Sequence, residues 1–196
     1  MDAIALLKAD HRAVEELFEK FEKARDDGRK KELATTICHE LIVHTIIEEE
    51  IFYPAVRGKV EDDLLDESYV EHDGAKMLIA EILAGSPGDD FFDAKVTVLK
   101  EQIEHHVKEE EKPGEGLFAQ ARHAAEKAAS KKKAAEKDEA VDLDELGAAM
   151  QARKEELMQT IAEEGADMLQ TRSFHAGAPA QGEPPAARAP LEPGFA

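Results

Sequence analysis

Apolar residues recur at alternating intervals of three and four in four stretches of the first 112 residues. This spacing places side chains on one face of an α-helix, so it predicts helices over residues 2–25, 30–57, 62–85 and 89–112. The inward stripe of each helix is called its seam below. The four seams contain, in order, Ile4, Leu7, His11, Val14, Phe18 and Phe21; Ile37, Leu41, His44, Glu48, Ile51 and Ala55; Leu65, Tyr69, His72, Ala75 or Lys76, Ile79 and Ile82; and Phe92, Val96, Leu99, Ile103, His106 and Glu110.

The connections between these helices are short and contain glycine and proline, as in AGSPGDD (84–90) and at Pro113-Gly114. Short connections force consecutive helices to be antiparallel neighbours. We therefore predict an all-α fold, with an up-down-up-down four-helix bundle over residues 1–125.

The character of the chain changes beyond the bundle. Residues 126–141 are rich in Ala, Lys and Glu and are predicted to form a linker or a solvated helix. An appended C-terminal helix is predicted over 142–165, with Asp142 as N-cap and Glu145 as its capping-box partner. The narrow apolar stripe of this helix must cover the bundle or another subunit. The stripe consists of Leu143, Leu146, Met150, Leu157 and Ile161. Residues 166–196, dominated by Ala, Pro and Gly, are predicted to be a disordered tail.

Composition narrows the classes of function. The formal charge of −19 disfavours general binding to nucleic acid or to anionic membranes, because phosphates would be repelled. Cys38 is the only cysteine, which excludes an internal disulfide and a multi-thiolate metal site. No apolar run is long enough to span a membrane, and the N-terminus has no signal-peptide pattern. We expect a cytoplasmic protein.

Each seam is interrupted by one histidine, and two seams continue with a glutamate four residues later. A charged carboxylate left unpaired in a core costs several kcal/mol. Metal ions are the simplest partner for all six groups, and imidazole with carboxylate suits iron, manganese or zinc. The predicted ligands are His11, His44, Glu48, His72, His106 and Glu110.

Four short motifs carry a family resemblance: DHR (10–12), HTIIEEEIFYP (44–54), EHD (71–73) and HHVKEEE (105–111). In order and spacing they resemble the hemerythrin-like HHE cation-binding domain, over roughly residues 1–125. The resemblance implies a non-haem di-iron centre in a four-helix bundle. His11 and His44 would bind one iron, His72 and His106 the other. Glu48 and Glu110 would bridge them, together with an oxo or hydroxo group.

Some assignments stay open from the sequence. His105 and Glu109 form a second pair of the same spacing, although His106 and Glu110 continue the seam. Lys76 stands where oxygen-carrying hemerythrins have a fifth histidine, and Tyr69 is an alternative ligand. The remaining histidines are interpreted as surface residues: His39, His123 and His175.

The resemblance implies binding of dioxygen, peroxide or nitric oxide. The leading hypothesis is an oxidative-stress scavenger, with a catalase- or peroxidase-like activity that decomposes peroxide. One alternative is an iron or oxygen sensor that signals through self-association or a partner of helix 142–163. Another is a reversible oxygen carrier, which the missing fifth histidine disfavours. A metal-free interaction module must explain six buried polar groups. Ferritin-like storage is set aside, because no histidine has a glutamate three positions before it.

Overall fold

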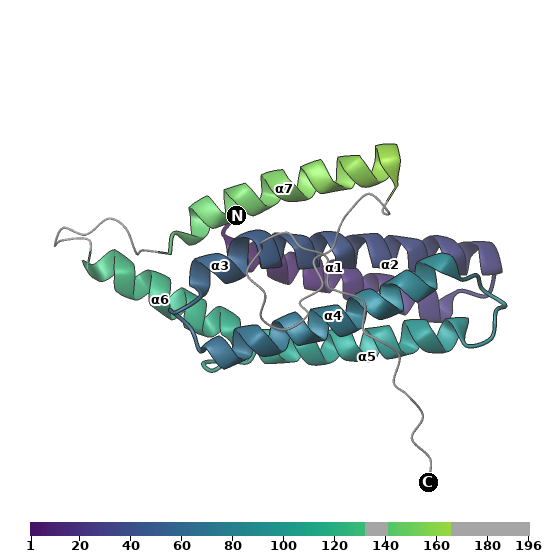
Figure 1. Cartoon of the computed structure of the whole chain (residues 1–196), viewed down its shortest axis with the longest axis horizontal. Coiled ribbons are helices and arrows are strands. Elements are labelled where there is room, and N and C mark those ends of the chain that lie inside the picture. Colours follow the sequence, from purple (N-terminus) through teal and green to yellow (C-terminus); the bar gives the residue numbers. More distant parts are fainter. Residues whose placement is uncertain (132–140, 166–196) are drawn as a thin grey trace, which may run out of the picture.

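The structure is a computed structural model that describes residues 1–131 and 141–165. Within these ranges every regular element is a helix. Four long helices lie side by side and alternate in direction, α1 (Ala3–Lys23), α2 (Asp27–Ile47), α4 (Asp62–Ala84) and α5 (Phe92–Glu110) (Figure 1). The predicted all-α four-helix bundle is confirmed. The predicted disordered tail, His175 and residues 132–140 of the predicted linker lie outside the described ranges.

The helix ends follow from local chemistry. Asp2 and Asp26 are N-caps whose carboxylates accept hydrogen bonds from the backbone N–H groups of Ala5 and Arg29, at 2.8 Å and 2.9 Å. α5 begins three residues later than predicted. Phe91, immediately before it, has a left-handed backbone conformation with φ 68°, so the chain cannot be helical there.

The second predicted helix is not one continuous α-helix. α2 ends at Ile47 and is followed by a π-helical turn, η1 (Glu48–Phe52), and by the short α3 (Tyr53–Val56). A π-turn inserts one extra residue, which rotates everything after it relative to the seam. The predicted seam residues Ile51 and Ala55 are therefore only half-buried. Three other residues take the inward positions and are fully buried: Phe52, Tyr53 and Val56.

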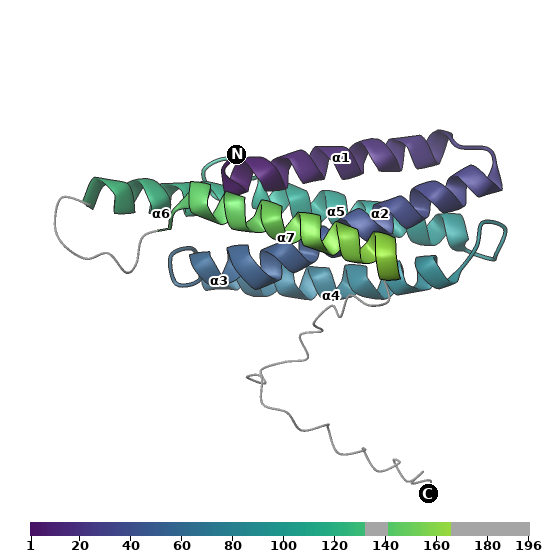
Figure 2. The ribbon, with the colours of Figure 1, turned by 90° about the horizontal axis from the view of Figure 1, so that it is seen from above.

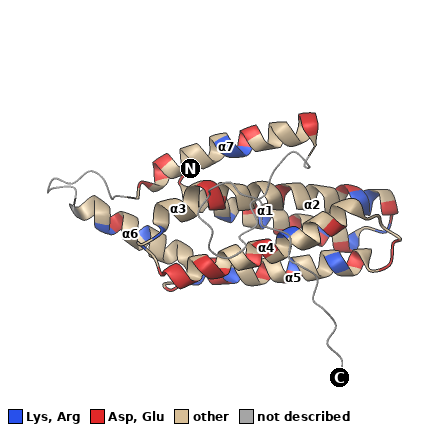
Figure 3. Ribbon diagram, viewed as in Figure 1, with Lys and Arg blue, Asp and Glu red and all other residues tan. Residues whose placement is uncertain are grey.

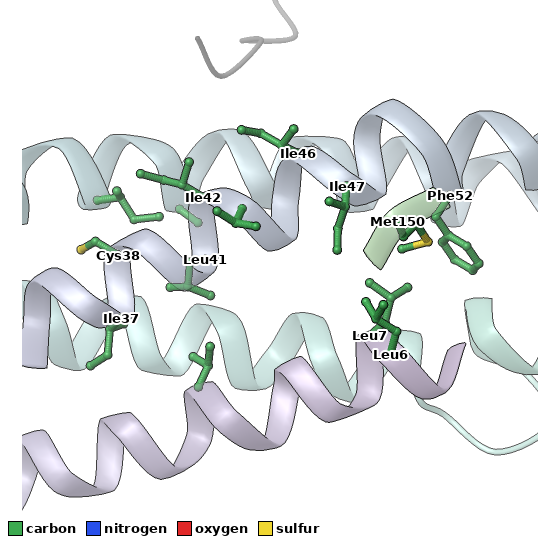
Figure 4. Close-up of a cluster of buried hydrophobic side chains, with 14 of the residues drawn as sticks. Leu6, Leu7, Ile37, Cys38, Leu41, Ile42, Ile46, Ile47, Phe52 and Met150 are labelled. Atoms are coloured by element: carbon green, nitrogen blue, oxygen red, sulfur yellow. The ribbon is translucent and has the colours of Figure 1, made fainter. Parts of the chain in front are cut away.

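The apolar core extends along the bundle on both sides of the polar seam residues. Figure 4 shows one cluster of it, with Ile37 and Cys38 of α2 toward one end. At the other end Phe52 of η1 and Met150 of the C-terminal helix lie with Leu7 of α1. The core therefore includes side chains from outside the four-helix bundle.

The first of two further helices, α6 (Leu117–Lys131), extends past the end of the bundle (Figure 1). It follows a turn at Gly114, which has φ 78°. α6 crosses the boundary at residue 125 that the sequence suggested. Its first turn is buried: Leu117 and Phe118 are 1% and 2% exposed. The start of α6 thus belongs to the core of the bundle.

The second, α7 (Leu143–Glu164), lies across α1 and α2 (Figures 1 and 2). Asp142 is its N-cap, as predicted. The predicted stripe is buried against the bundle except for the half-buried Leu146. Gly147 permits this approach: a Cβ there would lie 2.3 Å from the backbone oxygen of Met1. No helix in the described ranges is both long and apolar enough to cross a membrane.

Candidate metal centre

Six seam residues from five helical segments meet in one buried layer. The histidines lie on α1, α2, α4 and α5, and the glutamates lie at the first residue of η1 and the last of α5. None is more than 6% exposed. The structure therefore brings together the complete predicted set: His11, His44, Glu48, His72, His106 and Glu110.

The four histidines form two pairs. The Nε2 atoms of His11 and His44 lie 3.1 Å apart, and those of His72 and His106 lie 3.3 Å apart. Two ligands bound at about 2.1 Å to one metal ion, at roughly a right angle, lie about 3.0 Å from each other. Each pair therefore has the spacing of two ligands of the same ion.

The two glutamates connect the pairs. Glu48 Oε2 lies 3.3 Å from His44 Nε2 and 3.3 Å from His72 Nε2. Glu110 Oε2 lies 3.5 Å from His11 Nε2 and 3.6 Å from His106 Nε2. Each carboxylate thus faces one histidine of each pair.

A second set of acids surrounds the histidines, here called the outer carboxylates: Asp10, Glu49, Glu71 and Glu111. Each faces the Nδ1 atom of a histidine on the next helix around the bundle. The distances are 2.8 Å for His11–Glu111, 3.0 Å for His72–Glu49, 2.7 Å for His106–Glu71 and 3.7 Å for His44–Asp10. The four links form a closed ring through α1, α2, η1, α4 and α5.

This ring determines which nitrogen faces the centre. A carboxylate facing Nδ1 favours the tautomer with its proton on Nδ1, which leaves the Nε2 lone pair free. The Nε2 lone pairs of each histidine pair then face each other. Glu48 Oε1 and Glu110 Oε2 are also buried without a hydrogen-bond partner. Opposed lone pairs and unpartnered carboxylate oxygens are the donor set of a cation, and the residues fit a pair of metal ions.

The buried carboxylates have opposite pKa shifts. Burial and the negative charge of Glu48 raise the pKa of Glu110 above its usual range. Burial also acts to raise the pKa of Glu48, but His44 and His72 outweigh it and lower that pKa when they carry the protons that metal ions would replace. Two carboxylates in one closed layer cannot both ionise without added positive charge. Metal ions would supply it.

Basic groups pair with the outer carboxylates from outside. Arg12 donates to Glu111 at 2.6 Å and Lys76 donates to Glu49 at 2.7 Å. Lys76 is the residue that stands where oxygen-carrying hemerythrins have a fifth histidine. Its Nζ also lies 3.3 Å from Asp73 Oδ1. Lys76 therefore acts on His72 through Glu49.

Tyr53 is a site residue that the sequence interpretation missed. Its hydroxyl donates to Glu110 Oε1 at 3.0 Å and lies 3.3 Å from Glu48 Oε2 and 3.4 Å from His72 Nε2. It comes five residues after Glu48, off the seam spacing, and the π-turn brings it inward. The alternative ligand Tyr69 is half-buried, and its ring packs edge-on against Tyr53 at 5.2 Å.

The structure also separates the two registers at the end of α5. The His106 side chain is 4% exposed, whereas that of His105 is 61% exposed and faces Glu71 at 3.5 Å. Glu109 is half-buried, in contrast to the fully buried Glu110. Of the other histidines in the described ranges, His123 is exposed and His39 is half-buried.

We compared the chain with proteins of known structure and with named proteins of similar sequence. A solved structure, the hemerythrin HHE cation-binding domain-containing Rv2633c homolog from Mycobacterium kansasii, superposes with a TM-score of 0.62. The match covers 85% of this chain and 96% of that one at 20% identity, so it shows a shared fold. A protein named DNA nickase, from Nostoc sp. strain PCC 7120, is 31% identical over 118 residues. This chain spans only 33% of that relative's length.

The family comparison covers more than half of the chain. Residues 2–113 match the family described as the hemerythrin HHE cation-binding domain. This region contains α1 to α5, and with them every ligand candidate and every outer carboxylate. The chain belongs to the hemerythrin HHE cation-binding domain family.

Proposed function

We propose that this chain holds two iron ions and uses them to remove peroxide or related oxygen species. His11 and His44 would bind one ion, and His72 and His106 the other. Glu48 and Glu110 would bridge the ions, with an oxo or hydroxo group between them. The observation that carries this proposal is the double pairing described above, in which each glutamate faces one histidine of each pair.

Bound iron would supply one electron per ion and open coordination positions for dioxygen, peroxide or nitric oxide. The protein would supply proton control. The Tyr53 hydroxyl holds a proton against Glu110 Oε1, inside a layer closed to water by the surrounding core. The ring of outer carboxylates fixes the histidine tautomers. These roles suit peroxide decomposition, because two peroxide molecules give two water molecules and one dioxygen without an external reductant.

One surface cavity is our candidate for the access route of a small substrate. A surface cavity of about 260 Å³ lies between α1 and α5 and is lined by His11, Phe18, Ile103 and Glu111, among others. Of its lining residues, Glu111 contacts His11 Nδ1 at 2.8 Å. A diatomic gas or peroxide fits a cavity of this volume.

A sensor is the second candidate, because α7 packs on the bundle beside the candidate centre. In that case iron binding would change how α7 docks. Limited proteolysis across residues 113–165, with and without iron, tests this alternative, and unchanged cleavage would exclude it. Reversible oxygen carriage is disfavoured, because Lys76 replaces the fifth histidine.

The name of the Nostoc relative raises the question of nucleic acid. That name belongs to a longer protein, of which this chain covers only 33%, and the net charge of −19 here opposes phosphate binding. Acidic positions lie along α2, α4, α5 and α7 in Figure 3, and this view shows no broad basic face. We therefore propose a cytoplasmic protein that acts on small oxygen species. A plasmid-nicking assay of the iron-loaded chain tests the alternative.

The first experiment is anaerobic loading with Fe(II), followed by air and then by peroxide. We expect two irons per chain, an oxo-bridged absorption band in the near ultraviolet, and peroxide turnover. A matched pair of variants localises the site: His106→Gln should lose iron, while the neighbouring His105→Gln should keep it. A stable, reversible oxygenated spectrum without peroxide turnover would refute the scavenger function.

A further inference from the structure

The ring of outer carboxylates has one link that differs from the other three. Three histidine–carboxylate links are hydrogen bonds of 2.7–3.0 Å. The fourth, between His44 Nδ1 and Asp10 Oδ2, spans 3.7 Å. Both of these atoms are buried, and neither has a hydrogen-bond partner within the described chain. They face each other across a gap that a small movement of Asp10 would close.

Asp10 is held from outside the bundle. The Nζ of Lys154, on α7, donates to Asp10 Oδ1 at 2.7 Å and lies 3.3 Å from Glu40 Oε2. The side chains of Lys154 and Asp10 are 20% and 12% exposed, so water screens their ion pair little. Lys154 thus holds one oxygen of the carboxylate while the other faces His44.

The corresponding cations elsewhere in the ring come from the bundle itself. Arg12 of α1 pairs with Glu111, and Lys76 of α4 pairs with Glu49. The partner of Asp10 comes instead from a helix that lies beyond residues 2–113, the region matching the family. Within the described chain, the lysine that pairs with Asp10 therefore comes from outside the region that matches the family.

We propose that Lys154 is a positioning residue of the metal centre, acting on His44 through Asp10. Its ammonium group holds Asp10 Oδ1, so that Oδ2 faces His44 Nδ1 and His44 presents Nε2 to the metal ion that it shares with His11. α7 is then a functional part of the centre rather than only a cover for the bundle. This inference rests on the proposed metal site.

Removing a group behind a metal-binding histidine typically weakens binding about 10- to 100-fold. Lys154 is one step further out, so we expect the low end of that range. The effect should be confined to one of two ions, because His72 and His106 have their own outer carboxylates. This asymmetry distinguishes positioning from a general loss of stability.

The test uses Zn²⁺, which suits imidazole and carboxylate ligands and is redox-inert. Lys154→Met keeps the apolar stem of the side chain and removes its charge. We expect one of two Zn²⁺ ions to bind about tenfold more weakly, and the other with unchanged affinity. Lys154→Arg should restore binding. In NMR spectra of the zinc-loaded chain, Lys154→Met should shift the Nδ1–H signal of His44 alone.

Two further variants establish the route. Arg153→Met is the matched control, because Arg153 anchors α7 to Glu50 of η1 at 3.0 Å instead of to an outer carboxylate. Its other contact, with Glu156 at 2.8 Å, lies within α7. Arg153→Met should leave both affinities unchanged. Asp10→Asn should weaken binding of the same Zn²⁺ ion as Lys154→Met. The variant with both substitutions should bind this ion no more weakly than Asp10→Asn alone.

The outcomes separate the two proposals. If the natural chain binds no Zn²⁺, the metal site itself is refuted, and the role of Lys154 with it. If it binds two ions and Lys154→Met binds them equally well, only the positioning role is overturned. Equal weakening in Lys154→Met and Arg153→Met would also overturn it, because α7 would then act only as a tether. Circular dichroism of each variant confirms that it is folded.

Discussion

Docking of α7 on the bundle can be tested at a single side chain. Met150 is 0% exposed and packs in the same core cluster as Leu6, Leu7 and Phe52 (Figure 4). Met150→Ala removes most of this side chain and leaves a cavity between α7 and the bundle. The substitution touches no charged group of the candidate centre, so it probes packing alone.

The expected loss follows from burial. Replacing a fully buried methionine by alanine costs about 2–5 kcal/mol, from lost transfer free energy and from the cavity. Partial collapse of the site around the shortened side chain reduces this loss, so we expect about 3 kcal/mol. For a folded region of this size, each kcal/mol corresponds to roughly 2–4 °C, which predicts a melting temperature lower by about 6–12 °C.

The assay is urea unfolding of the metal-free chain, monitored by circular dichroism. Met77→Ala is the control, since Met77 is 70% exposed and should change the free energy of unfolding by less than about 0.5 kcal/mol. Limited proteolysis then shows whether α7 detaches before the bundle unfolds. Equal stability of the two variants would show that α7 is not packed as described.

Three further predictions concern the centre and the core. Glu48→Gln should weaken the binding of both Zn²⁺ ions by at least about 100-fold, whereas Glu111→Gln should weaken the binding of only the ion held by His11, by about 10- to 100-fold. A chelator competition titration compares these affinities, and equal effects of the two variants would contradict the geometry. Tyr53→Phe should keep Zn²⁺ affinity within about threefold but lower peroxide turnover by about tenfold or more, because the proton donor to Glu110 is lost; unchanged turnover would contradict this role. Burial raises the pKa of the Cys38 thiol to about 12, so a disulfide reagent at pH 8 should react with it only after unfolding, and rapid labelling of the native chain would show an open core.

The bundle was predictable because the spacing of three and four residues in the seams determines which side chains face inward and are buried. Leu7, Leu41 and Leu99 are all at most 3% exposed, as their positions in the pattern require. The same spacing selected His106 over His105, since one residue of offset turns a helical side chain by about 100°. Amphipathic periodicity thus located the six predicted ligands without any structural information.

The π-turn was not predictable in this way. Nothing in EEEIF (48–52) differs in composition from an ordinary helix, although Phe52 and the following Tyr53 are fully buried in the structure. Its effect is local but decisive, because it exchanges Ile51 and Ala55 for Phe52 and Tyr53 on the inner face. Extending a regular period through this segment therefore missed Tyr53.

The outer carboxylates had a signal that periodicity alone does not reveal. Each one adjoins a predicted ligand in the sequence: DH at 10–11, EE at 48–49, EH at 71–72 and EE at 110–111. A residue next to an inward-facing ligand is rotated toward the boundary with the neighbouring helix. From there it reaches the histidine of that helix instead of its own. The pairing between helices needs the bundle, whereas the acidic neighbours are visible in the sequence.

The polar layer runs against stability and therefore points to function. Buried ionic groups are often less stabilising than apolar residues of similar volume. Here six such groups, with four carboxylates behind them, occupy the middle of a core that leucine and isoleucine could fill. The ring also restricts the fold, because sliding or rotating any one helix would break two of its links. Ions bound at this layer would offset its cost, since a ligand that binds only the folded chain stabilises it by about 2.7 kcal/mol at 100 times its dissociation constant. The same groups that weaken the metal-free bundle would thus make its stability depend on the proposed metal ions.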